Sequence, residues 1–208
     1  MKDSTDRIGI PDILKNVVTI LKAHRGAFQQ ERPFRRALGL FFAELFRFGR
    51  HTISQEMLSL GITDEDWSAW YRLFSRPRYE EENLASCLLK ETIEHVMEDE
   101  PYTVAIDSTT IHRSSLRMPG TSWLQDSRFS AFRPGIHRAQ RFVHGAWLTP
   151  MEVGYSRAIP LRFLPAFPPK AVAAQVLAQK EWEAGLSFLR WLRESLDQLG
   201  RSKQTVLA

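Results

Sequence analysis

Cysteine is nearly absent from this sequence, since Cys87 is the single cysteine among 208 residues. A lone cysteine excludes a disulfide bond within the chain and a zinc site built from cysteines. Long apolar runs are also missing: no stretch of about 18 uncharged apolar residues occurs, so no membrane span is expected. Residues 1–15 are charged and have no apolar centre, so no secretory signal is expected either. These absences predict a cytoplasmic protein.

The formal net charge of +4 is small, but the charge is unevenly distributed along the chain. Residues 52–100 hold twelve acidic and four basic side chains, whereas residues 101–170 hold nine basic and three acidic ones. Eight of those nine are arginine, whose planar guanidinium binds phosphate through paired hydrogen bonds. A surface with this excess of positive charge attracts polyanions by counterion release. A solvated face that balances the acidic half explains the same pattern equally well.

The first hundred residues are predicted to be helical. Apolar side chains recur with the spacing of one helix face in residues 13–21, 34–48 and 81–97. The helix at 34–48 is apolar around most of its circumference, so we expect it to be buried. Between them, Thr52 is predicted to cap a short helix that Gly61 ends, and Thr63 or Asp64 to cap the next one. Two short helices joined by a glycine turn have the outline of a helix-turn-helix DNA-binding motif. The acidity of this segment fits a plain helical scaffold equally well.

The chain changes character at residues 98–101, which are charged and contain a proline. We therefore predict a helical region of residues 1–98, with a helix-turn-helix candidate, and a second region of residues 101–208.

The second region is predicted to contain three strands, a long helix and the start of a fourth strand. Its first strand is the β-rich run 102–106, which ends at Asp107, and the polar, arginine-rich residues 108–136 that follow predict a long loop. Further strands are expected at 140–148 and 151–163, the helix at 171–199, and the last strand from 204. The inner face of the helix is expected to carry Val176, Trp182, Leu186, Leu189, Leu192 and Leu196.

A family resemblance begins at residues 105–110, whose sequence Ala-Ile-Asp-Ser-Thr-Thr resembles the first catalytic segment of the insertion-sequence DDE transposases. In that family an apolar strand leads into an aspartate followed by serine and threonine. The similarity extends through Arg-Met-Pro-Gly at 117–120, through residues 142–148, and on to Ala-Ile-Pro-Leu at 158–161. It covers most of residues 52–169.

The resemblance implies an α+β chain, in which a helical DNA-binding region precedes the first half of a ribonuclease-H-like domain. Asp107 would be the first catalytic carboxylate and a metal ligand, and a second Asp and a Glu would follow beyond Ala208. Three carboxylates are needed because two Mg²⁺ ions about 4 Å apart require anionic oxygen ligands. One carboxylate cannot assemble that pair.

The chain is therefore expected to be part of a transposase, inactive alone, from a mobile element of a bacterium. Its expected cofactor is Mg²⁺, bound weakly or not at all by this part of the protein. Its expected partner is DNA at the transposon ends, and a homodimer of the full-length protein and association with the nucleoid are further expectations. Two alternatives remain: a non-catalytic DNA-binding remnant or inhibitor of transposition, and a helical interaction protein with no nucleic-acid role.

Other interpretations of the individual residues stay open. Taken alone, Asp107 fits a turn after a strand, because aspartate is common there. Asp126 and Glu152 do not occupy the positions of the family pattern and are expected at the surface. A histidine metal site is disfavoured, because the histidines match no ligand spacing and imidazole is a poor ligand for Mg²⁺; the three are His112, His137 and His144.

The expected DNA contacts of the second region are the arginines of its long loop. Aromatic residues among them, Trp123, Phe129 and Phe132, are suited to stacking on unpaired bases. The alternative is that the aromatic side chains pack the loop onto the sheet and the arginines are only solvated. The candidate contacts are Arg113, Arg117, Arg128, Arg133, Arg138 and Arg141.

Overall fold

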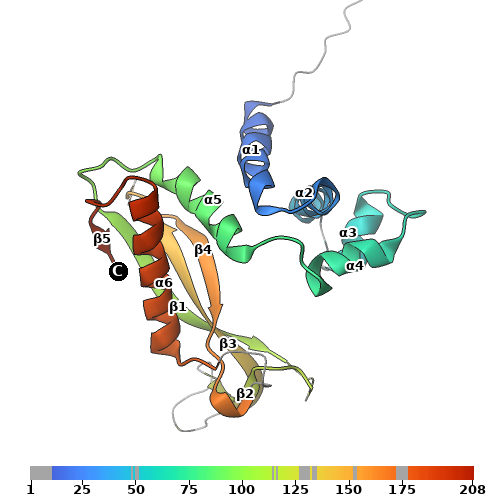
Figure 1. Ribbon diagram of the computed structural model, residues 1–208. Coiled ribbons are helices and arrows are strands. Elements are labelled where there is room, and N and C mark those ends of the chain that lie inside the picture. The colour runs from blue at the N-terminus through green and yellow to red at the C-terminus, as the bar shows by residue number, and fades with distance from the viewer. Residues whose placement is uncertain are drawn as a thin grey trace, which may run out of the picture. The chain divides into compact units, whose positions relative to one another are not determined.

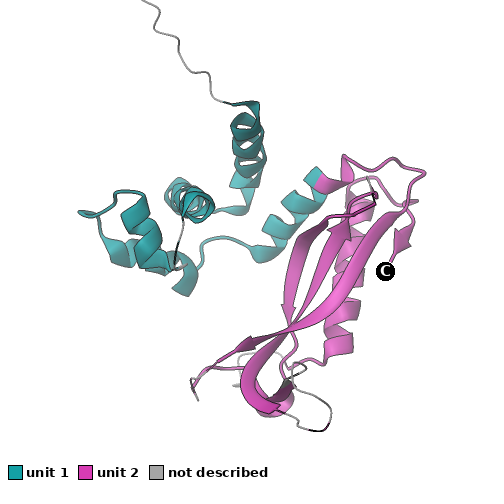
Figure 2. Cartoon of the chain, turned by 180° about the vertical axis from the view of Figure 1, so that it is seen from behind, with its two compact units in different colours: residues 1–91 teal, residues 92–208 magenta. Residues whose placement is uncertain are grey.

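The chain folds into two compact units, residues 1–91 and residues 92–208, which we call the helical unit and the sheet unit (Figure 2). The computed structural model describes residues 11–47, 49, 52–113, 115, 117–126, 132, 135–151, 154–171 and 178–208. No helix within these ranges is long and apolar enough to cross a bilayer.

The predicted helices of the first hundred residues are confirmed, with some shifted ends (Figure 1). The last of them ends at Ile93 rather than near residue 97. Asp66, and not Thr63 or Asp64, caps the fourth helix, because its carboxylate accepts a hydrogen bond of 3.0 Å from the backbone N–H of Ser68. The elements are α1 (Asp12–Ala23), a 3₁₀ turn (His24–Ala27), α2 (Glu31–Phe46), α3 (Ile53–Ser59), α4 (Trp67–Ser75) and α5 (Glu81–Ile93).

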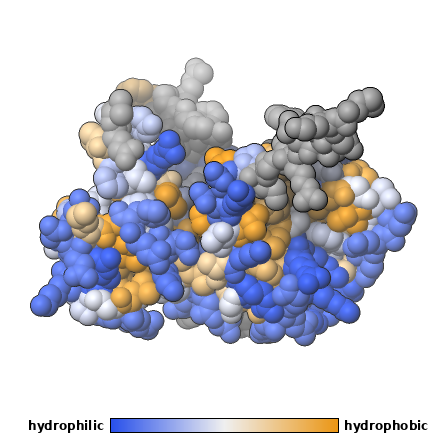
Figure 3. All heavy atoms as spheres, turned by 90° about the horizontal axis from the view of Figure 1, so that it is seen from above, coloured by the Kyte–Doolittle hydropathy of each residue, from blue (hydrophilic) through white to orange (hydrophobic). Residues whose placement is uncertain are grey.

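The core of the helical unit lies between α2, α3 and α4. Gly39 of α2 lies against α4, since an added Cβ would lie 3.3 Å from the ring of Trp70. Glycine at this position therefore lets the two helices pack closely. The prediction that α2 is buried is wrong for part of its surface, since Phe46 is 64% exposed. Figure 3 shows such hydrophobic residues at the surface among hydrophilic ones. The buried core residues are Ala27, Phe28, Phe34, Leu40, Met57, Trp70 and Leu73.

The sheet unit is built on one long central strand, β3 (Gly135–Leu148). Along one side β3 pairs antiparallel with β1 (Tyr102–His112). Along the other side it pairs antiparallel with β2 (Thr121–Asp126) over its first half and with β4 (Ala158–Pro165) over its second half. The short β5 (Val206–Leu207) runs parallel to β1 and completes a mixed five-stranded sheet. The predicted α+β class, consistent with a ribonuclease-H-like domain, is confirmed.

Several sequence-based predictions for the strands of this unit are wrong. Residues 108–136 are not one long loop, because β1 continues to His112 and β2 follows before β3 begins. Asp107 therefore lies in the middle of a strand rather than at its end. The third predicted strand begins at Ala158 rather than at residue 151. The threonines after Asp107 explain the longer β1, since β-branched side chains favour strands even where the surface is polar.

The long helix α6 (Glu181–Gln198) lies across one face of the sheet (Figure 1). It begins ten residues later than predicted, since residues 178–180 are not helical, while residues 172–177 lie outside the described ranges. Its predicted inner face is also partly wrong, because Trp182 is 61% and Leu186 41% exposed. The face that packs on the sheet carries Ala184, Phe188, Trp191, Leu192, Ser195 and Leu196.

Candidate active site

Asp107 lies on the face of the sheet opposite α6. Its neighbour Ile106 packs with Val143 and Ala184 in the core beneath α6. Successive side chains of a strand point to opposite faces, so Asp107 projects away from that core. Its side chain is exposed, and Oδ1 accepts a hydrogen bond of 2.7 Å from the backbone N–H of Ser108. That bond occupies one carboxylate oxygen and leaves Oδ2 available to a ligand from solvent.

His144 of β3 lies directly opposite Asp107 in the strand register. Residues paired in this way share a face and have Cβ atoms about 5 Å apart. The imidazole of His144 stacks on Phe163 of β4, with ring centroids 5.3 Å apart. Its Nδ1 is buried and makes no hydrogen bond to any described residue. The carboxylate and the imidazole are therefore cross-strand neighbours on a face that carries a partly exposed aromatic ring.

The side chains around Asp107 do not form a complete metal site. No group of three His, Cys, Asp or Glu residues within the described ranges lies close enough to hold a metal ion. On the face of Asp107 the nearest oxygen donor of the same strand is the hydroxyl of Thr109, two residues along. Mg²⁺ requires six ligands in near-ideal octahedral geometry and binds protein mainly through carboxylates. A single carboxylate beside an imidazole supplies one suitable ligand and does not fit a pair of Mg²⁺ ions.

The other histidines lie apart from this pair. His112 and His137 stack on each other with ring centroids 3.8 Å apart. Alternation along β1 and β3 places both on the opposite face from Asp107. Of the two further carboxylates considered from the sequence, Asp126 is the last residue of β2, and Glu152 lies outside the described residues.

The candidate DNA-contact arginines are divided between the two faces. Arg138 of β3 shares the face of Asp107, where it donates to Thr121 Oγ1, and Arg113 reaches the same face to donate to Gln140 Oε1 at 2.9 Å. Arg141 lies on the α6 face, paired with Glu181 at 2.7 Å. Arg117 is exposed in the segment between β1 and β2. Arg128 and Arg133 lie outside the described residues.

The predicted aromatic contacts are exposed where they can be described. Trp123 is 67% exposed and lies opposite Arg138 in the β2–β3 register, and Phe132 is 96% exposed. Phe129 lies outside the described residues.

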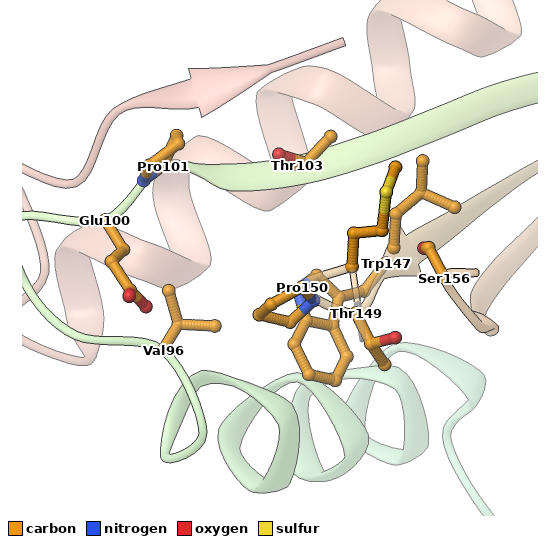
Figure 4. A pocket seen from close by; sticks show the side chains of 10 residues that line it. Val96, Glu100, Pro101, Thr103, Trp147, Thr149, Pro150 and Ser156 are labelled. Carbon is orange, nitrogen blue, oxygen red and sulfur yellow. The ribbon is translucent and has the colours of Figure 1, made fainter. Parts of the chain in front are cut away.

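The start of β1 borders a pocket of about 420 Å³ that does not include Asp107. The side chains of Val96, Thr103 and Pro150 surround it, with Trp147 and the carboxylate of Glu100 nearby (Figure 4). The lining is mostly apolar. Because Thr103 and Asp107 are four residues apart on one strand, the pocket lies roughly 13 Å from Asp107 along β1 and is a separate feature.

Sequence reasoning missed the proximity of His144 to Asp107. Residues 142–148 carry part of the family resemblance, but nothing in the spacing of two strands indicates which residues pair across them. Alternation along β3 shows which residues share a face with His144. The residue of β1 that lies opposite His144 depends on the register between the two strands.

Comparison with known proteins agrees with the resemblance in the sequence. The family model of the DDE superfamily endonucleases matches residues 26–207, which is most of the chain. No curated protein and no solved structure matches it. Members of this family act on DNA and generally use divalent metal ions. From the extent of the match, this chain belongs to the DDE superfamily endonucleases.

Proposed function

We propose that this chain is part of a DNA transposase of a mobile element and that Asp107 is one of the carboxylates of its catalytic centre. In this proposal residues 1–98 are a DNA-binding region and residues 101–208 belong to the catalytic domain. The observation that carries the proposal is an exposed carboxylate in mid-strand, on the face of the sheet away from α6, in a chain whose family consists of endonucleases.

Divalent metal ions held in such a centre would supply the activation of water or a 3′-hydroxyl and the stabilisation of the leaving oxygen of the phosphodiester. Asp107 is the residue of this chain that would hold one of them, through the oxygen not bonded to Ser108. The described residues supply no group of three ligands. We therefore propose that the 208-residue chain binds DNA without cutting it.

The arginines on the face of Asp107 suggest where DNA would lie. Arg138 is six residues along β3 from His144, the partner of Asp107, which is roughly 20 Å at 3.3 Å per residue. About six base pairs of B-form DNA span that length. Arg113 and Arg138 are thus placed to contact phosphates a few nucleotides from a scissile bond held at Asp107.

A nicking assay tests the inactivity of the chain. The purified chain is incubated with supercoiled plasmid in Mg²⁺ or Mn²⁺, alongside the Asp107→Asn variant. We expect both to leave the plasmid intact, because one carboxylate does not assemble the metal pair. Nicking by the chain that Asp107→Asn abolishes would contradict the proposed inactivity while supporting the catalytic role of Asp107.

Localised cleavage of the protein itself tests the metal-binding role of Asp107. Fe²⁺ can replace Mg²⁺, and with ascorbate and hydrogen peroxide it cuts the polypeptide beside its binding site. We expect fragments ending near Asp107 and His144, suppressed by excess Mg²⁺ and lost in Asp107→Asn. The matched control is Glu194→Gln, which removes an exposed carboxylate of α6 and should leave the fragments unchanged. Cleavage that is unaltered in Asp107→Asn would contradict the assignment of Asp107 as a metal ligand.

A non-catalytic DNA-binding role is supported by the same limited set of ligands around Asp107. It predicts a mobility shift with duplex DNA that weakens with salt and does not change in Asp107→Asn, together with no Fe²⁺ cleavage at β1. The Fe²⁺ cleavage therefore separates a disabled catalytic centre from a strand that has no metal-binding role, since DNA binding should persist in Asp107→Asn in both cases.

A further inference from the structure

The helical unit contains a groove of about 520 Å³ whose lining is unusually rich in arginine. Arg32 and Arg36 come from the first turns of α2, Arg72 from α4, and Arg76 and Arg78 from the segment that follows α4. The sequence does not show this cluster, because Arg32 and Arg36 lie about 40 residues before the other three arginines. Those three belong to residues 52–100, a stretch that is acidic overall.

The packing of the helical unit brings these arginines together. Arg32 and Arg36 are four residues apart on α2 and so lie on the same face of that helix. The floor between α2 and α4 includes Pro33 and Leu73, both buried side chains of the helical unit. Next to the groove, Trp70 of α4 packs against Gly39 of α2.

The segment that carries Arg78 is fixed to the chain just before α2. Phe28 and Tyr79 form an antiparallel bridge, and their ring centroids lie 5.5 Å apart. The backbone N–H of Gln29 donates to the carbonyl of Arg78 at 3.1 Å, and the Arg78 guanidinium donates to Gln30 Oε1 at 2.8 Å. Arg78 is therefore held at the edge of the groove beside the start of α2.

Most of the positive charge in the groove has no carboxylate partner. Arg72 is paired with Asp66 at 2.8 Å, and Arg78 contacts a neutral amide. Within the described ranges, the guanidinium groups of the remaining arginines make no hydrogen bond or ion pair; these are Arg32, Arg36 and Arg76.

Two carboxylates also line the groove, and neither cancels this charge. Asp66 is already paired with Arg72, and Glu65 accepts a hydrogen bond from the indole N–H of Trp70 at 3.3 Å. Four cationic groups thus face the groove against the single carboxylate of Glu65. Keeping like charges together is unfavourable unless an anion occupies the space between them.

We propose that this groove is a phosphate-binding site through which the helical unit holds the backbone of duplex DNA. Guanidinium groups on α2 and after α4 line its two sides, an arrangement that suits several donors to successive phosphates of one strand. The proposal rests on the proposed function only for the identity of the polyanion, and it assigns DNA binding to residues outside the arginine-rich segment of the sheet unit.

Binding of a short fluorescein-labelled DNA duplex to the full chain, followed by fluorescence anisotropy at low salt, tests the proposal. We expect Arg32→Gln/Arg36→Gln to weaken binding about tenfold or more. The slope of log affinity against log salt should become shallower by about 0.9 for each phosphate that the variant no longer binds. The matched control is Arg35→Gln on the same helix, whose guanidinium pairs with Glu31 at 2.9 Å outside the groove. It removes the same kind of charge and should change affinity less than about twofold.

Equal weakening by Arg35→Gln, or unchanged binding in the double variant, would overturn the groove as the site. If circular dichroism shows that the double variant is unfolded, Arg76→Gln replaces it, since Arg76 follows the end of α4 and its substitution should remove about one phosphate contact. Polyglutamate that binds as tightly as DNA, with the same dependence on Arg32 and Arg36, would identify an acidic protein partner and refute the assignment to DNA.

The outcome is independent of the active-site proposal. Failure of the groove leaves the Fe²⁺ cleavage at Asp107 unaffected, whereas failure of the Asp107 assignment leaves the anisotropy of the arginine variants unaffected.

Discussion

The helical unit and the sheet unit bring their charged residues together by different means. In the helical unit, helices α2 and α4 pack through a small core, and the arginine groove lies beside that core. In the sheet unit, the register of β1 and β3 alone sets Asp107 opposite His144. The first arrangement tolerates small shifts, since long arginine side chains can follow a phosphate. The second does not, because a one-residue slip in register would move His144 to the other face.

The independence of the two units is tested most strongly by Phe188→Ala. Phe188 lies on the face of α6 that packs on the sheet and is 1% exposed. Removing its ring should therefore lower the free energy of unfolding by about 3 to 5 kcal/mol. Hydrogen exchange measured by mass spectrometry should accelerate in β1, β3 and α6 and stay unchanged in α2 to α4. Trp182→Ala, at a residue 61% exposed on the same helix, is the control with little effect. Faster exchange throughout α2 would show that the units unfold as one.

The reverse experiment is Met57→Ala in the helical unit. Met57 is completely buried, so its truncation should cost about 2 to 4 kcal/mol, with faster exchange in α2, α3 and α4 only. Leu58→Ala, at the adjacent residue that is 47% exposed, should cost much less. If the sheet strands lose protection in Met57→Ala, the two units do not have separate stabilities.

Tyr102→Phe probes a buried polar contact found in the sheet unit. The Tyr102 hydroxyl lies 2.7 Å from Thr92 Oγ1, and removal of the hydroxyl should cost about 0.5 to 1.5 kcal/mol, the net contribution of one hydrogen bond. Burial also raises the pKa of Tyr102 above its ordinary value of 10. The folded state therefore keeps this proton more tightly than the unfolded state does, and stability should fall as the pH rises above 10.

Chemical unfolding at a series of alkaline pH values measures this effect. The difference between the wild-type chain and Tyr102→Phe should narrow above pH 10, where only the wild type loses the contribution of Tyr102. A constant difference across that range would contradict the burial of the hydroxyl in solution.

A crossed pair of functional variants tests whether each unit has its own task. Arg32→Gln/Arg36→Gln should lower DNA affinity about tenfold and preserve the Fe²⁺ cleavage near Asp107, whereas Asp107→Asn should abolish that cleavage and change affinity little. Loss of both activities in either variant would show that the two sites depend on each other.

The smallest effect is expected from Arg141→Gln. The ion pair between Arg141 and Glu181 at 2.7 Å joins β3 to the first turn of α6, but both side chains are partly exposed. Such pairs contribute about 0 to 1 kcal/mol, so the midpoint of chemical unfolding should shift only slightly. A clear decrease in DNA affinity would indicate that Arg141 contacts DNA in spite of its position on the α6 face.

The helices could be predicted from the sequence because they depend on local periodicity and on turn residues near one another in the chain, and the fold class followed from the family resemblance. The strand β2 was missed because Thr121–Asp126 is short and lies among polar residues, so its pairing with β3 and not its own composition makes it a strand. The inner face of α6 was misjudged because Phe188 packs over Gly145, where an added Cβ would clash with the ring. Such a contact between distant residues leaves no periodic signal.

The candidate site was predictable only in part for the same reason. Asp107 stands in a recognisable segment, whereas the pairing with His144 and the arginine groove both join residues that are far apart in the chain. Periodicity and motif patterns describe neighbours along the sequence, and these two features are contacts in space.

The central place of β3 has a consequence for how the chain folds as it is synthesised. All the core residues of the helical unit lie before β1, so that unit can form early. β1 must wait for β3, whose residues pair with it only after roughly 30 more have been added, a delay on the order of seconds at ribosomal speed. During that interval Tyr102 and Val104, both buried in the native sheet, are exposed on an unpaired strand. Conditions that slow synthesis between β1 and β3 should therefore favour aggregation of the nascent sheet unit.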